Sequence, residues 1–276
     1  MMRLPVRLIA VDMDGTLLRS DKTVDPKTAA DIQAALDRGI LTAYCTGRGV
    51  AEMRDIFPLL PIIRYAVCSS GAVIWDRAAD RCLYTEGIRQ PYIDRIVETA
   101  LKYSAMPHFL TERESVAAGA DICRMADFMR GVYQPMFERL ARQVPDMAAE
   151  GRKYSLIPKI NIYFHTLEDR DKGYAELKEL PLQLCFSEDA TLEITPPGIS
   201  KATGLKRLTD HLHIPLGQTA AVGDNYNDTE MLAAAGFSVA MGNAVPELLA
   251  SCDHVTADND HNGVGAAIRF ILEMNS

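Results

Sequence analysis

Short apolar runs recur along the chain, and each is followed directly by Asp, Thr, Ser or Gly. They lie at 6–11, 40–45, 65–69, 219–222 and 237–241. Runs of this length that end in turn residues are typical of buried parallel strands. Between them, apolar residues recur at helical spacing; the helices this predicts lie at 26–38, 50–57, 200–211, 228–235, 245–251 and 264–273. Strand and helix in alternation predict an α/β fold, a doubly wound, Rossmann-like parallel sheet.

This alternation breaks between about residues 84 and 189. The elements predicted there are a helix at 92–103, a strand at 107–111, a largely helical stretch at 122–143, a strand at 159–165, a helix at 169–180 and strands at 183–187 and 191–195. Strands and helices without a parallel rhythm are typical of an α+β module. We therefore expect a core domain of residues 1–83 and 190–276, with an inserted domain of residues 84–189.

Composition narrows the class of protein. The 276 residues carry a net charge of −8 and scattered Lys and Arg residues, which argues against a nucleic-acid partner and against a membrane partner. No run approaches the roughly 20 apolar residues of a membrane-spanning helix, and the first run ends in acidic residues instead of a cleavage site. The six cysteines form no Cys-x-x-Cys pair, so we expect reduced thiols and a cytoplasmic location.

Two carboxylates follow the first apolar run, in Asp12-Met13-Asp14-Gly15-Thr16. Open α/β sheets bind ligands at the carboxyl ends of their strands, and residues two apart on a strand share a face. Asp12 and Asp14 can therefore address one site. Carboxylates this close repel one another unless a cation lies between them, and a divalent cation is the simplest solution. By itself, the pattern also fits a polar turn.

Three further motifs follow in order at strand ends or helix starts. They are Thr46-Gly47-Arg48, the segment 198–204 with Lys201, and Gly223-Asp224-Asn225-Tyr226-Asn227-Asp228. Together, the four motifs resemble those of the haloacid dehalogenase-like (HAD) hydrolases over nearly the whole chain. The insert resembles their type IIB cap, and Met241-Gly242-Asn243-Ala244 with the stretch 259–264 resembles the Cof-type phosphatase branch. That branch usually has Asn-Gly-Ala after its third core strand, where this chain has Ser70-Gly71-Ala72.

The resemblance implies catalytic roles for the first motif. Asp12 is the expected nucleophile, which forms an aspartyl-phosphate. Asp14 is the expected general acid, which protonates the leaving oxygen and then acts as the base that activates water. Relatives that transport ions or cleave carbon–halogen or carbon–phosphorus bonds typically lack an acid at this position. Asp14 therefore favours phosphoester hydrolysis.

The other motifs are expected to bind phosphate and metal. Phosphate contacts are assigned to Thr46, Gly47, Lys201 and Asn227, whereas Arg48 fits a substrate contact and a solvated arginine about equally well. Mg²⁺ is the expected cofactor, and its ligands are assigned to Asp12, Asp14 (through its carbonyl) and Asp224. Asp228 is expected to hold either Lys201 or the water molecules of the metal.

These assignments predict a phosphatase that acts on a small phosphorylated metabolite, either a sugar phosphate or a phosphorylated cofactor such as pyridoxal phosphate. A hexose-phosphate mutase of the phosphomannomutase type is an alternative, because those enzymes share this cap. A phospho-receiver domain is a second alternative, but receivers have roughly 120 residues and no insert. In the family, cap residues select the leaving group, and the polar candidates here are His108, Arg113, Arg130 and His165.

Overall fold

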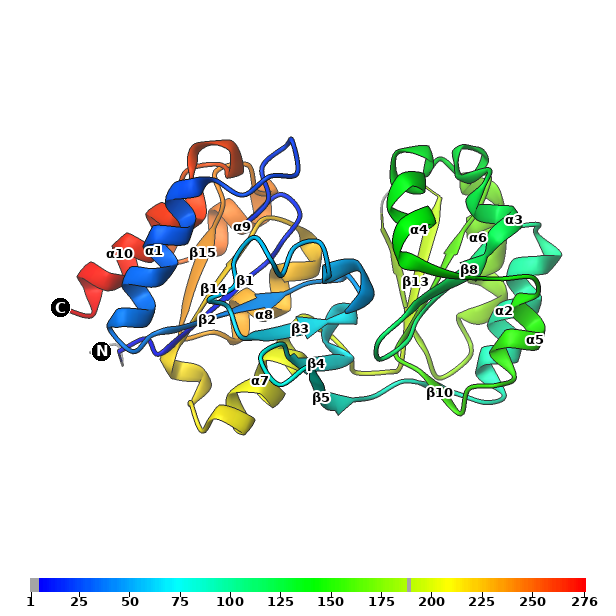
Figure 1. Ribbon diagram of the computed structural model, residues 1–276, viewed down its shortest axis with the longest axis horizontal. Coiled ribbons are helices and arrows are strands. Elements are labelled where there is room, and N and C mark those ends of the chain that lie inside the picture. Colours follow the sequence, from blue (N-terminus) through cyan, green and yellow to red (C-terminus); the bar gives the residue numbers. More distant parts are fainter. Residues whose placement is uncertain (1–4, 188–189) are drawn as a thin grey trace. The chain divides into compact units, whose positions relative to one another are not determined.

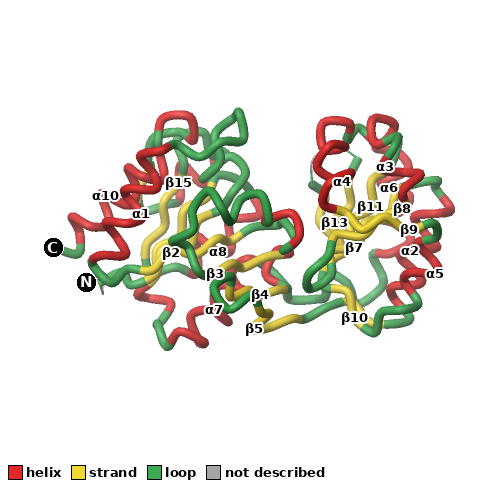
Figure 2. Tube along the Cα trace, viewed as in Figure 1, coloured by secondary structure: helices red, strands yellow, loops and turns green. Residues whose placement is uncertain are grey.

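The computed structural model describes residues 5–187 and 190–276. The chain forms two compact units (Figures 1 and 2). Unit 1 comprises Met1–Gly47, Asp55–Tyr84 and Ser200–Ser276, and unit 2 comprises Arg48–Arg54 and Thr85–Ile199. Asp189, the expected end of the insert, lies outside the described residues. Among the helices that are described, none combines the length and apolar character needed to cross a membrane.

Unit 1 is built on an eight-stranded sheet in the order β16-β15-β14-β1-β2-β3-β4-β5. In that order, the strands are His254–Val255, Phe237–Ala240, Thr219–Gly223, Leu8–Val11, Leu41–Cys45, Tyr65–Cys68, Val73–Asp76 and Arg81–Thr85. The strands from β16 to β3 are parallel, whereas β4 runs antiparallel to β3. The chain winds outward from β1 in both directions, so the predicted doubly wound α/β fold is confirmed and β1 lies at the point where the strand order reverses.

Helices cover the sheet of unit 1. They are α1 (Pro26–Asp37), α7 (Lys201–Leu212), α8 (Thr229–Ala234), α9 (Pro246–Ser251) and α10 (Gly263–Met274). Helix α1 begins as its sequence predicts: Asp25 accepts a hydrogen bond from the backbone N–H of Lys27 at 2.8 Å, and Pro26 occupies the first turn. The first and last helices, α1 and α10, pack side by side (Figure 1).

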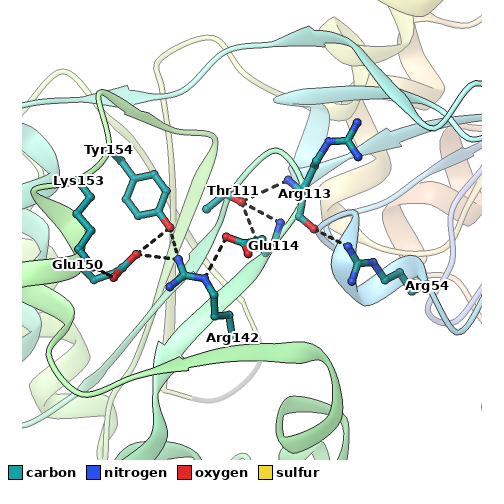
Figure 3. Close-up of polar contacts among 8 residues, drawn as sticks. All are labelled: Arg54, Thr111, Arg113, Glu114, Arg142, Glu150, Lys153 and Tyr154. Carbon is teal, nitrogen blue, oxygen red and sulfur yellow. Dashed lines mark hydrogen bonds and ion pairs between the residues drawn. The ribbon is translucent and has the colours of Figure 1, made fainter.

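The helix predicted at 50–57 is only a short 3₁₀ helix, η1 (Ala51–Met53). Tertiary contacts place this part of the chain in unit 2. A Cβ on Gly49 would lie 2.8 Å from the Leu110 side chain, so the two segments are tightly packed. Arg54 also donates a hydrogen bond to the carbonyl of Arg113 at 3.5 Å (Figure 3).

Unit 2 contains a six-stranded sheet in the order β12-β13-β11-β7-β8-β9. In that order, the strands are Gln183–Phe186, Thr191–Thr195, Lys159–Tyr163, Met106–Leu110, Ser115–Ala118 and Ala141–Val144, and β6 (Ile88–Arg89) pairs separately with β10 (Leu156–Ile157). All neighbours in the larger sheet are antiparallel except β8 and β9. Because β13 bonds to both β11 and β12, residues 191–195 belong to unit 2, beyond the boundary expected at residue 189.

The helices of unit 2 are α2 (Tyr92–Lys102), α3 (Gly119–Ile122), α4 (Gln134–Leu140), α5 (Met147–Gly151) and α6 (Leu167–Leu177). The stretch 122–143, predicted to be largely helical, is broken into short pieces that include η3 (Met125–Phe128) and η4 (Gly131–Tyr133). Met129 adopts a left-handed conformation (φ 60°) that ends η3. The end of the stretch forms β9, because its backbone pairs with β8.

Arg142 ties β9 to the helical layer of unit 2 (Figure 3). Its guanidinium donates to Glu114 at 3.1 Å, to Glu150 at 2.7 Å and to the Tyr154 hydroxyl at 2.6 Å. Hydrogen bonding to Arg142 lowers the pKa of the buried Glu150 to about 2. This charge cluster therefore stabilises unit 2 as long as Glu150 is ionised.

Candidate active site

Three buried carboxylates meet where the chain leaves the two central strands of unit 1. Asp12 directly follows β1, Asp224 directly follows β14, and Asp228 ends the short helix η6 (Tyr226–Asp228). Each of these residues is less than a tenth exposed. Their carboxylate oxygens lie within 4.8 Å of one another. This cluster lies at the reversal of strand order, where open α/β sheets bind their ligands.

Lys201 bridges two of these carboxylates. It is the first residue of α7, whose start is fixed by reciprocal hydrogen bonds between Ser200 and Thr203. The ammonium group donates to Asp12 Oδ1 and, at 2.7 Å, to Asp228 Oδ1. Burial by itself would lower the pKa of Lys201, but the Asp12 and Asp228 carboxylates raise it above the ordinary value. The lysine therefore stays charged. Its attraction to the two carboxylates offsets the unfavourable interaction of a cation with the N-terminus of a helix.

One ammonium does not balance three carboxylates. Burial, followed by repulsion from Asp228, raises the pKa of Asp12 although Lys201 opposes the shift. Burial also raises the pKa of Asp224 to about 6, and Asp228 contributes in the same direction. Two raised pKa values among buried oxygen ligands indicate that the site lacks positive charge. A divalent cation that prefers oxygen fits this donor set.

Asp228 is fully occupied by its neighbours. One of its oxygens accepts from Lys201, and the other accepts from the backbone N–H groups of Asp224 at 3.0 Å and Asn225 at 3.1 Å. A Cβ at Gly223 would lie 2.6 Å from the Asp228 carboxyl carbon, so only glycine allows this approach. These contacts favour Asp228 as the residue that orients Lys201 and Asp224.

Thr16 is a site residue for which the sequence analysis assigned no role. Its hydroxyl donates to Asp224 Oδ1 at 2.6 Å, across 208 positions of the chain. Gly15 has a φ of 85°, and a Cβ there would overlap the Asp224 carboxylate. Both residues therefore let the turn after β1 hold Asp224 in place. The Gly-Thr pair that ends the first motif was the available signal.

Asp14 lies outside the carboxylate cluster found among the described residues. Its side chain is 39% exposed, and Oδ1 lies 3.0 Å from the ammonium of Lys22. The structure therefore separates the two carboxylates of the first motif: Asp12 is buried against Lys201, whereas Asp14 is accessible to solvent.

Thr46 follows β2, the strand adjacent to β1, so it lies at the same carboxyl edge as Asp12. Its backbone is held from two sides, because its N–H donates to Val67 at 2.8 Å and its carbonyl accepts from Ser70 at 3.0 Å. Ser70, the departure from the Cof-type pattern, adopts a left-handed conformation with a φ of 58°. Asn tolerates that conformation better than Ser does, yet the bond to Thr46 is made by the backbone and is retained here.

The remaining phosphate-binding candidates are accessible. Gly47 and Arg48 are partly exposed, and they lie on either side of the boundary between the two units. Asn227 is exposed on η6, one residue before Asp228.

The polar candidates of unit 2 have different surroundings. His108 is buried between the hydroxyls of Ser115 (2.7 Å) and Tyr163 (3.1 Å), and burial lowers its pKa to about 3. His165 stacks on Phe128, and both of its ring nitrogens lie against backbone carbonyls. Arg130 is buried against Thr191, and Arg113 is exposed. His108 therefore belongs to the interior of unit 2, whereas His165 is partly exposed.

Comparison with known proteins identifies the family of this chain. The family described as haloacid dehalogenase-like hydrolase matches residues 9–268. Phosphatase YwpJ of Bacillus subtilis (strain 168) is 30% identical, over 97% of this chain and 100% of that protein. HMP-PP phosphatase of Citrobacter koseri is also 30% identical, over 91% of this chain and 89% of that protein. The HAD subclass IIB sugar phosphatase BT4131 shares the fold, with a TM-score of 0.81 at 21% identity over 98% of this chain and 100% of that one.

The family match spans most of the chain. Asp12, Lys201, Asp224 and Asp228 lie together in one buried cluster. The named relatives at 30% identity are both phosphatases. The chain therefore belongs to the haloacid dehalogenase-like hydrolases, as a phosphoric monoester hydrolase of the Cof-type branch with a type IIB cap.

Proposed function

We propose that this phosphatase is Mg²⁺-dependent and hydrolyses a sugar phosphate or a phosphorylated cofactor through an aspartyl-phosphate on Asp12. One observation carries the proposal: the Asp12 carboxylate is held by a buried ammonium group, which Asp228 fixes from its other side at 2.7 Å. A buried carboxylate fixed in this way has a defined direction of attack. Asp224 lies beside it and completes a set of oxygen ligands suited to Mg²⁺.

In the first half of the reaction, an oxygen of Asp12 attacks the phosphorus atom and the bond to the leaving oxygen breaks. Asp14 gives its proton to that oxygen, which departs as an alcohol. Lys201 and the backbone around Thr46 and Gly47 stabilise the charge on the phosphoryl oxygens. Mg²⁺, when held by Asp12, Asp224 and the carbonyl of Asp14, reduces the repulsion between the anionic nucleophile and the anionic substrate.

In the second half, Asp14 has become a carboxylate and takes a proton from water. The resulting hydroxide attacks the phosphorus atom of the aspartyl-phosphate. Inorganic phosphate leaves, Asp12 is regenerated as a carboxylate, and Asp14 carries the proton for the next cycle. The exposure of Asp14, in contrast to that of Asp12, suits a group that exchanges protons with leaving groups and water.

One face of the unit 2 sheet carries polar side chains that favour a substrate with a polar leaving group. Along β11, Ile160 and Ile162 enter the apolar core, so Lys159 and Asn161 lie on the opposite face. Lys159 contacts Glu193 at 2.7 Å. Asn161 is 7% exposed, and among the described residues its Oδ1 has no hydrogen-bond partner. We infer that this face recognises hydroxyl or amino groups, such as those of a sugar or a nitrogenous cofactor.

The test is phosphate release from a panel of sugar phosphates, phosphorylated cofactors including pyridoxal phosphate, and HMP-PP, each with and without Mg²⁺. Asp12→Asn keeps the shape of the side chain and removes the attacking charge, so turnover should vanish while the fold survives. Release by Asp12→Asn at near wild-type rate would overturn the covalent mechanism. Net conversion between two hexose phosphates would indicate a mutase instead, and a long-lived phosphoprotein would indicate a receiver.

A further inference from the structure

The turn after β1 is held by two asparagine side chains from the C-terminal part of unit 1. Asn243 Nδ2 donates to the carbonyl of Gly15 at 2.8 Å. Asn243 Oδ1 accepts from the backbone N–H of Asn259 at 3.0 Å, and Asn259 Nδ2 donates to the carbonyl of Leu18 at 3.0 Å. We call Asn243 and Asn259 the asparagine clamp. Its orientation is fixed by its partners, because a carbonyl can only accept and a backbone N–H can only donate.

The clamp holds the backbone that follows Asp14 at two points, the carbonyls of Gly15 and Leu18. Gly15 is the next residue in the chain, and Leu18 pairs with Asp14 in an isolated β-bridge. The Asp14 side chain is 39% exposed, so its position depends on the conformation of this turn and on its ion pair with Lys22. Gly15 has a φ of 85°, a conformation that glycine adopts readily, and it has no side chain that could pack to hold the turn. Backbone hydrogen bonds from Thr16 and Leu18 to the carbonyl of Met13 restrict the turn from within, and the bond from Asn243 to Gly15 restricts it from outside.

The loop that carries Asn243 is also anchored to the Asp224 side of the site. Val245 N–H donates to the carbonyl of Asp224 at 3.0 Å, and Met241 N–H donates to the carbonyl of Gly223 at 3.0 Å. The same loop therefore bonds to the ends of both β1 and β14. Ser20 adds a further link, because its N–H and hydroxyl both donate to Asp260, next to Asn259, at 2.9 and 2.7 Å.

We propose that Asn243 is a positioning residue for the acid–base carboxylate Asp14, and that Asn259 holds Asn243 in place. The proposal rests on the role of Asp14 in the proposed function. A general acid contributes about 10²- to 10⁴-fold only when its proton reaches the leaving oxygen at hydrogen-bond distance. Releasing the Gly15 carbonyl lets the turn sample other conformations, and proton transfer becomes less frequent.

The need for the proton differs between substrates, and this difference provides the test. A sugar or other alkyl phosphate has a poor leaving group that must be protonated, whereas 4-nitrophenol leaves readily as its anion. The measured quantity is kcat/KM for each, because it reports the steps up to loss of the leaving group and not the later hydrolysis of the aspartyl-phosphate. For Asn243→Ala, we expect kcat/KM to fall at least about 10-fold on the best alkyl phosphate and less than about 3-fold on 4-nitrophenyl phosphate.

Two further variants strengthen the design. Asn243→Asp has the same shape and still accepts from the N–H of Asn259, but it cannot donate to the carbonyl of Gly15. It should therefore lose more kcat/KM on the alkyl phosphate than on 4-nitrophenyl phosphate. This variant tests the proposal even if the alanine variant folds poorly. Asn275→Ala is the matched control. Asn275 bonds the backbone of Val6 at 3.0 and 2.8 Å, before the opposite end of β1, so its loss should spare both substrates equally.

The outcomes separate the two proposals. Absence of phosphatase activity in the wild-type protein would count against the proposed function and not against the clamp. With an active wild-type protein, equal losses on both substrates would mean that Asn243 acts only through the overall fold. No loss on either substrate would mean that the turn holds Asp14 without help. Both results would overturn the inference.

Discussion

Lys201→Met tests the charge balance of the site most directly. Methionine keeps most of the length of the side chain but removes the ammonium group that Asp12 and Asp228 share. All three residues are less than a tenth exposed, so solvent cannot replace the lost charge. The variant leaves Asp12, Asp224 and Asp228 within 4.8 Å of one another without their shared cation.

The magnitude follows from the geometry. At the 2.7 Å between Lys201 Nζ and Asp228 Oδ1, Coulomb's law with an effective dielectric constant of about 20 gives about 6 kcal/mol of gross attraction. The cost of burying the lysine is recovered on substitution, which leaves the roughly 3–5 kcal/mol typical of removing one partner of a buried pair. For chains near this size, each kcal/mol of lost unfolding free energy lowers the Tm by about 2–4 °C. The Tm of the variant should therefore be about 6–20 °C lower at neutral pH.

The loss should depend on pH. In the variant, protonation of Asp12 and Asp224 relieves the repulsion, so the destabilisation should shrink as the pH falls below about 6, the pKa of Asp224. The assay is thermal unfolding by circular dichroism in chelator at pH 5 and pH 7.5. Lys206→Met is the control, because Lys206 lies on the same helix and pairs with Asp210 at 2.7 Å, but in an exposed position worth under about 1 kcal/mol. Equal Tm changes in the two variants, or a change that is the same at both pH values, would refute the reasoning.

Three other predictions follow from the structure. In the metal-free protein, the raised pKa values of Asp12 and Asp224 contribute stability at low pH, and this stability is lost as the pH rises through those pKa values. The gain in Tm on adding Mg²⁺ should therefore grow from pH 5 to pH 8, and a gain that shrinks would contradict this. Replacing residues 85–199 by a short Gly/Ser linker should, if the protein stays soluble, preserve Mg²⁺ binding and reduce discrimination among substrates; an unchanged ranking of kcat/KM would show that unit 2 does not select the substrate. Arg142→Met should lower the Tm near neutral pH and have less effect as the pH falls towards 2, where Glu150 becomes protonated; an equal loss at both pH values would exclude the charge pair as its cause.

Local patterns in the sequence were sufficient for the central strands of unit 1 and for the edge at which the candidate site lies. The apolar run before Asp12 and the one before Gly223 form the adjacent central strands β1 and β14. A parallel sheet brings its carboxyl ends to one edge, so residues that follow these strands must be near one another. The N-cap at Asp25 was equally readable, because its side chain accepts from an N–H group only two residues along the chain.

Contacts between distant segments required the tertiary structure. The bonds from Thr16 to Asp224 and from Asn243 to Gly15 span 208 and 228 positions, and no periodicity records such pairings. The segment Arg48–Arg54 begins within the second motif, Thr46-Gly47-Arg48, yet it packs into unit 2. Its local sequence predicts a helix, but packing against a distant strand outweighs that preference.

The sequence by itself therefore indicated the candidate site residues: Asp12, Asp14, Lys201 and Asp224 are expected from their motifs. The tertiary structure decided how these groups differ in burial and in pKa. Burial and the nearby Asp228 raise the pKa of Asp12, and the carboxylates of Asp12 and Asp228 keep Lys201 charged. Asp14, two residues from Asp12, remains partly exposed. The reason is that a motif specifies residue types and spacing, whereas desolvation and charge–charge interactions depend on which distant atoms surround each group.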